Sequence, residues 1–147
     1  MFFRNLTLFR FSESVAKSLK SLEKKLDDAR LRPCGPLELS TRGFVSPLGR
    51  IEETLVHRVS DYALVTVGGE DKLLPSSVVN EQLAARLQKI TEKEGRKIGA
   101  RERKRLKDEV LTDLLPRAFV RPYKVSAYLD KKNGWFVVDS ASRKAAE

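Results

Sequence analysis

The sequence predicts an α+β protein: a mixed or antiparallel sheet with one packed amphipathic helix and a projecting, basic two-helix arm. Three observations lead to this fold class. Short β-branched and aromatic runs lie toward both ends of the 147-residue chain, as expected of strands. Apolar residues recur at helical spacing in two separate regions. The second of these regions also carries most of the net positive charge.

The first strand and the first helix are predicted near the N-terminus. Residues 5–11 form a candidate strand, because Leu6 and Leu8 share one face at a period of two. Ser12 or Ser14 is placed to cap the helix that follows. The helix has one apolar stripe at steps of three or four, made by Val15, Leu19, Leu22 and Leu26.

A hairpin is predicted from two short β-branched runs, 55–59 and 62–67. The two residues between them, Ser60-Asp61, form the turn. We expect Gly68-Gly69 to end the second strand, because adjacent glycines favour loops.

A second hairpin is predicted near the C-terminus, with strands at 118–129 and 135–138. Asn133-Gly134 lies between them. This dipeptide favours a type I′ turn, which needs positive φ at both central residues. Ser140 then caps a short C-terminal helix.

Two helices are predicted in the central region, the first starting after Pro75 and the second covering 100–115. Gly95 and Gly99 lie between them. A glycine costs about 1 kcal/mol relative to alanine inside a helix, so this pair predicts a turn. The apolar stripes of the two helices are Val79, Leu83, Leu87 and Ile90, then Leu106, Val110 and Leu114. The predicted domains are therefore a discontinuous sheet domain, 1–75 plus 120–147, and a basic helical domain, 76–119.

Positive charge is concentrated between Arg86 and Lys107. This stretch has ten basic and three acidic residues, or 10 − 3 = +7 of the total +9. Clustered cations attract polyanions, and nucleic acid is the commonest polyanionic partner. A solvated helix face is the alternative. The candidate phosphate-binding residues are Lys89, Lys93, Arg96, Lys97, Arg101, Lys104 and Arg105.

Residues for catalysis or metal binding are scarce. His57 is the only histidine and Cys34 the only cysteine, so a zinc site of the usual kind cannot be assembled. No Ser-His-Asp or Cys-His site has support from the residue spacing. We therefore expect no enzymatic activity, no metal and no cofactor. No apolar run approaches the ~20 residues of a membrane helix, so no membrane partner is expected.

Several short motifs resemble the recombination-associated protein RdgC family, in the family's order and spacing along the whole chain. Besides the basic helices, they are Phe3-Arg4-Asn5-Leu6, Arg32-Pro33-Cys34, Leu74-Pro75-Ser76, Lys107-Asp108-Glu109-Val110, Leu115-Pro116-Arg117-Ala118-Phe119 and Val138-Asp139-Ser140-Ala141-Ser142. The Leu-Pro-Arg-Ala-Phe element after a basic helix is the most specific of them. The C-terminal half of the family has no counterpart in this sequence.

The resemblance implies a bacterial, cytoplasmic and nucleoid-associated protein. It implies binding of double-stranded DNA without strong sequence preference and restraint of RecA-driven recombination. Family members dimerise into a ring around DNA, and a contact at the tip of the helical arm would correspond to the residues around Phe119. On the residues alone, Phe119 is either a core residue or such a homodimer contact.

Two other functions remain as alternatives. The charged helices could belong to a protein-interaction module that binds an acidic partner helix. The chain could also bind RNA, although it lacks the exposed aromatic residues that single-stranded RNA recognition usually uses.

Overall fold

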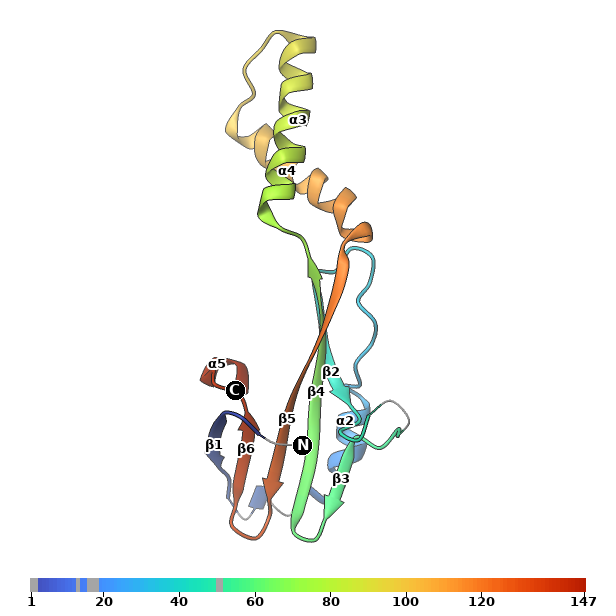
Figure 1. Cartoon of the computed structure of the whole chain (residues 1–147), viewed down its shortest axis with the longest axis vertical. Helices are drawn as coiled ribbons and strands as arrows, with labels where there is room; N and C mark the ends of the chain where they lie inside the picture. The colour runs from blue at the N-terminus through green and yellow to red at the C-terminus, as the bar shows by residue number, and fades with distance from the viewer. Residues whose placement is uncertain (1–2, 13, 16–18, 50–51) are drawn as a thin grey trace. The chain divides into compact units, whose positions relative to one another are not determined.

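The computed structural model describes residues 3–12, 14–15, 19–49 and 52–147 (Figure 1). The six described strands form one sheet with antiparallel pairs, and helices accompany it, which confirms the α+β class. In chain order the elements are β1 (Leu6–Arg10), η1 (Leu19–Ser21), α2 (Leu22–Asp27), β2 (Ser40–Val45), β3 (Val56–Val59), β4 (Tyr62–Leu73), α3 (Ser76–Glu94), α4 (Ala100–Leu114), η2 (Leu115–Arg117), β5 (Phe119–Asp130), β6 (Trp135–Asp139) and α5 (Arg143–Ala146).

The chain divides into two compact units. The sheet unit consists of Met1–Pro33, Thr41–Gly69 and Pro122–Glu147, and the helical unit of Cys34–Ser40 and Glu70–Arg121. Strands β4 and β5 contribute residues to both. The domain boundaries predicted from the sequence stay a prediction.

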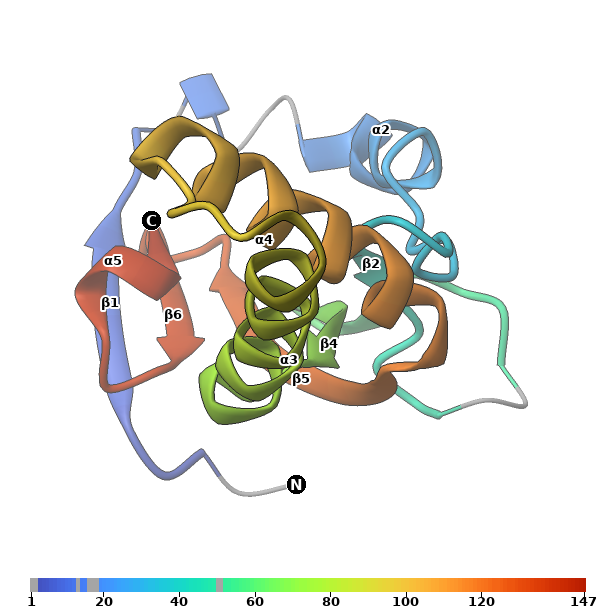
Figure 2. The ribbon, with the colours of Figure 1, turned by 90° about the horizontal axis from the view of Figure 1, so that it is seen from above.

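The strands are ordered β1-β6-β5-β4-β2, with β3 also paired to β4. The pairs β1–β6, β5–β6 and β3–β4 are antiparallel. Both predicted hairpins are confirmed, because Val59 pairs with Tyr62 and Asp130 with Trp135. In the sheet unit, α5 lies beside β1 and β6 in both views (Figures 1 and 2).

The core of the sheet unit lies on one face of its strands. Its buried members are Leu19, Leu26, Leu55, Val56, Ala63, Val65, Ala127, Leu129 and Val138. The helical stripe predicted from the sequence is thus buried at Leu19 and Leu26, although the described helix α2 is short. Residues 13 and 16–18 of the predicted helix lie outside the described part of the chain.

The buried face of strand β1 is the one opposite to its two leucines. Leu6 and Leu8 do share a face, but they are 57% and 54% exposed. Phe9, on the other face, packs against the core. The alternating pattern of a five-residue strand at the end of the sheet order does not decide which of its faces is buried. Burying the large Phe9 ring removes more apolar surface from water than burying a leucine would.

The prediction that Gly68-Gly69 ends a strand is wrong. Strand β4 continues through both glycines to Leu73, and both are buried. A Cβ at Gly68 would meet Val45 Cγ1 at 2.8 Å, and one at Gly69 would overlap the ring of Tyr123. These glycines therefore serve close packing against the strand rather than a turn.

We expect Gly69→Ala to destabilise the protein by roughly 1–3 kcal/mol, because the added methyl overlaps the half-buried Tyr123 ring. Urea unfolding measures the change. Gly99→Ala is the matched control, since no atom lies within 4 Å of its added Cβ and its φ is −74°. An equal loss of stability in both variants would contradict this account.

The turn of the second hairpin also differs from its prediction. It is a four-residue loop, 131–134, and of its residues only Gly134 has positive φ, at 70°. The Asp130 carboxylate organises the loop by accepting bonds from Asn133 N at 3.0 Å and Asn133 Nδ2 at 2.8 Å. These bonds, the side-chain bond first, lower the pKa of Asp130. Carboxylate capping of this kind favours the longer loop over type I′.

Candidate nucleic-acid interface

Helices α3 and α4 pack against each other in the helical unit through their predicted apolar stripes. Val79 and Leu83 of α3 and Leu106 and Val110 of α4 are buried. The two helices cross in both views (Figures 1 and 2). This packing leaves the remaining faces of both helices, which carry most of the charge, toward solvent.

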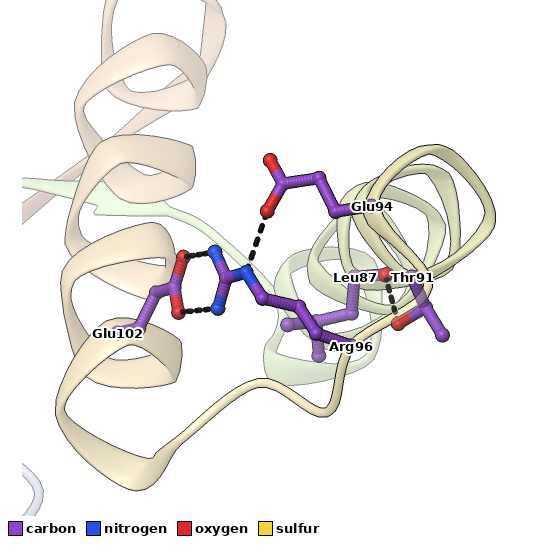
Figure 3. Close-up of polar contacts among 5 residues, drawn as sticks. All are labelled: Leu87, Thr91, Glu94, Arg96 and Glu102. Atoms are coloured by element: carbon purple, nitrogen blue, oxygen red, sulfur yellow. Dashed lines mark hydrogen bonds and ion pairs between the residues drawn. The ribbon is translucent and has the colours of Figure 1, made fainter.

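The turn between the helices is closed by Gly95 and Arg96. Gly95 has φ of 64°, and its N–H donates to Thr91 O at 2.9 Å, a common way to end a helix. Arg96 Nε donates to Glu94 Oε2 at 2.6 Å. Its two terminal nitrogens donate to the Glu102 carboxylate at 2.7 and 2.8 Å (Figure 3). The sequence places Arg96 among the phosphate candidates, whereas here its charge is balanced by two carboxylates.

The hydrogen bonds from Arg96 lower the pKa of Glu102, and the pKa of Arg96 is raised in turn. The bidentate pair therefore stabilises the turn at pH values above the pKa of Glu102 in the unfolded state. This stabilisation is lost as the pH falls through the lower pKa of Glu102 in the folded state. We expect Arg96→Gln to raise the pKa of Glu102 toward its ordinary 4.5. A carboxyl NMR titration measures it, with Arg101→Gln as control. An unshifted Glu102 would show that the contact does not persist in solution.

Two other arginines of this region also have acidic neighbours. Arg86 of α3 makes a short ion pair with Asp113 of α4 and lies 4.0 Å from Glu109. Arg105 lies 3.5 Å from Glu109, but it is 71% exposed. An exposed pair of this kind contributes at most about 1 kcal/mol, so Arg105 can exchange Glu109 for another anion at small cost.

The other five candidate phosphate contacts are exposed. Lys89 and Lys93 lie one turn apart on α3, Lys97 lies in the turn, and Arg101 and Lys104 lie on the exposed side of α4. Within the described ranges none of the five has an ion pair. Desolvation and competition from carboxylates are therefore small for these cations, which suits them to bind an external anion.

Arg117 is a further exposed cation, and it lies outside the basic stretch from which the phosphate contacts were predicted. Arg117 is exposed at the end of η2 and, with Arg86, lines a pocket of about 290 Å³ beside the last turn of α4. Two residues on, Phe119 is 82% exposed. Its ring is therefore not part of the core, and its role as a homodimer contact stays a prediction. The Leu-Pro-Arg-Ala-Phe element was the available signal, since its proline precedes an exposed arginine and phenylalanine.

Two kinds of feature are absent from the described residues. No helix among them is long and apolar enough to cross a bilayer. In the same ranges, no three His, Cys, Asp or Glu side chains are grouped so that they could hold a metal ion.

The chain combines an antiparallel sheet with a pair of basic helices and an exposed aromatic residue that follows them. The family model described as "Putative exonuclease, RdgC" matches residues 1–147. The chain belongs to the RdgC family, which confirms the resemblance seen in the sequence.

Relatives named "Recombination-associated protein RdgC" are similar over this entire chain. The protein of Xylella fastidiosa (strain 9a5c) is 53% identical, covering 100% of this chain and 48% of the relative. The protein of Xanthomonas axonopodis pv. citri (strain 306) is 51% identical, and that of Xanthomonas campestris pv. campestris (strain B100) is 50% identical, with the same coverage. The chain thus spans about half the length of the curated relatives that it matches.

Proposed function

We propose that this chain binds double-stranded DNA without sequence preference through the exposed cations of α3, α4 and their turn. The observation that carries this proposal is the set of five exposed cations without acidic partners among the described residues. They are Lys89, Lys93, Lys97, Arg101 and Lys104. The relatives' name, which refers to recombination, supports DNA as the polyanion.

Binding of this kind is electrostatic. Each lysine acts as a point charge on a phosphate, and each arginine can donate to two phosphate oxygens. Contacts to phosphate carry no sequence information directly. Each neutralised phosphate releases a counterion, so affinity falls steeply with salt, and a dissociation constant on the order of 10⁻⁴ to 10⁻⁶ M is expected near physiological salt.

The biological role that follows is restraint of RecA-type recombination by a nucleoid-associated protein. A protein that covers duplex DNA without sequence preference competes with the recombinase for the same backbone. A homodimer joined through Phe119 would place two sets of cations on one duplex, and linked sites bind more tightly than separate ones. We propose that the chain binds the duplex without hydrolysing it.

One titration separates this proposal from its alternatives. A labelled DNA duplex, an RNA hairpin and an acidic peptide are titrated with the protein at several salt concentrations. Duplex binding that weakens with salt supports the proposal. Preference for the peptide indicates a protein-interaction module, and preference for the hairpin indicates an RNA-binding protein. Incubating the bound duplex with Mg²⁺ or Mn²⁺ tests for exonuclease activity, and shortened DNA would contradict a purely binding role.

A further inference from the structure

Lys72 joins two segments of the helical unit through its side chain. Its ammonium donates to the carbonyl of Pro36 at 2.6 Å and to the carbonyl of Leu115 at 2.8 Å. Its backbone N–H donates to Leu39 O at 2.8 Å. The side chain is half-buried, and no carboxylate pairs with it in the described ranges. A charged donor shared by two carbonyls makes stronger hydrogen bonds than neutral pairs do.

One of these carbonyls lies where α4 ends. Leu115 is buried, caps α4 and begins η2, and its carbonyl also accepts from Ala118 N at 3.2 Å. The last carbonyls of a helix lack partners within it and carry partial negative charge, so a cation there is favourable. Four residues after Leu115 comes the exposed Phe119. Because η2 leads into Phe119, the first residue of β5, the direction of η2 helps to set where the Phe119 ring is presented.

The other carbonyl belongs to a segment that is itself held in place. Cys34 N donates to Glu70 Oε2 at 2.7 Å, and Gly35 N donates to Glu38 Oε2 at 2.8 Å. Pro36 follows directly, so its carbonyl is an anchored acceptor. The backbone of Lys72 is thus held in β4, and its ammonium joins the anchored Pro36 carbonyl to the end of α4.

We propose that Lys72 is a positioning residue for the self-association contact at Phe119. It sets the direction of η2 by bridging Leu115 to the 34–40 segment. This inference rests on the proposed Phe119 homodimer. Lys72 would support that contact without being part of it. Removing the ammonium while keeping the aliphatic chain frees η2, so Lys72→Met should weaken self-association about tenfold or more.

Sedimentation equilibrium of the full 147-residue chain tests the inference. The set comprises wild type, Phe119→Asp, Lys72→Met and, as matched control, Lys124→Met, an exposed lysine of β5. Association in wild type and Lys124→Met, weakened in Lys72→Met, supports it. Equal association of Lys72→Met and wild type overturns the Lys72 role alone. A wild type that stays monomeric, whatever its concentration, overturns the Phe119 contact and the Lys72 role together.

A chemical rescue separates positioning from mere folding. Cys34 is the only cysteine, so in a Cys34→Ser, Lys72→Cys protein the thiolate at position 72 alone displaces bromide from 2-bromoethylamine. The product is a lysine analogue with sulfur in place of Cγ. Alkylation with 1-bromopropane gives the same length without the charge. Association restored by the amine but not by the propyl group supports the inference, and equal effects of the two reagents overturn it.

Discussion

Reversing Arg101, Lys104 and Arg105 to glutamate is expected to remove most DNA binding while the fold survives. The three side chains are exposed, and of the three only Arg105 has an ion pair with another described residue, a weak one to Glu109. The change reverses three positive charges, so we expect an affinity loss on the order of 100-fold or more. The slope of log K against log salt should fall in magnitude by about 2.7, or about 0.9 for each lost phosphate contact. Fluorescence anisotropy at several salt concentrations measures both.

A control with the same change in net charge shows whether the loss of DNA affinity comes from the helical pair or from net charge alone. Lys24, Lys25 and Lys144 are exposed and lie in the sheet unit. Their reversal to glutamate changes the net charge equally and should weaken binding far less. Circular dichroism verifies that both variants are folded. Unchanged DNA affinity in the first variant, or equal losses in the two, would refute the assignment of the interface.

Phe119→Asp is expected to abolish self-association with almost no change in melting temperature. A ring that is 82% exposed contributes little to the fold of its own chain, and an aspartate there loses little on folding. In an apolar contact between two copies, the same aspartate would be buried without a partner, which costs several kcal/mol. Sedimentation velocity over a range of concentrations measures the association.

Leu48→Asp is the matched control, because Leu48 is also an exposed apolar residue but lies in a turn of the sheet unit. It should leave association unchanged. A large fall in melting temperature for Phe119→Asp would instead mean that the ring supports the fold. Unchanged association would place the contact elsewhere.

Local patterns predicted most of the elements correctly, and for a local reason. Val79 and Leu83 of one predicted stripe and Leu106 and Val110 of the other are buried as expected, because a helical period determines which side chains share a face. The break at Gly95 follows from the positive φ that glycine tolerates. The concentration of positive charge between Arg86 and Lys107 is a property of the residue order alone, so it predicts an anion-binding region without reference to the fold.

The sequence by itself therefore determined the fold class, the helical pair, the basic stretch and the family. Tertiary structure alone decided that Gly69 packs under the Tyr123 ring, because the two residues are far apart in sequence and only the paired strands bring them together. It also decided which cations are already paired. Arg96 is a candidate phosphate contact in the sequence, but Glu102 faces it across the turn. The hydrogen bond from Lys72 to the Leu115 carbonyl likewise depends on tertiary structure, because residues distant in sequence become neighbours only through the fold.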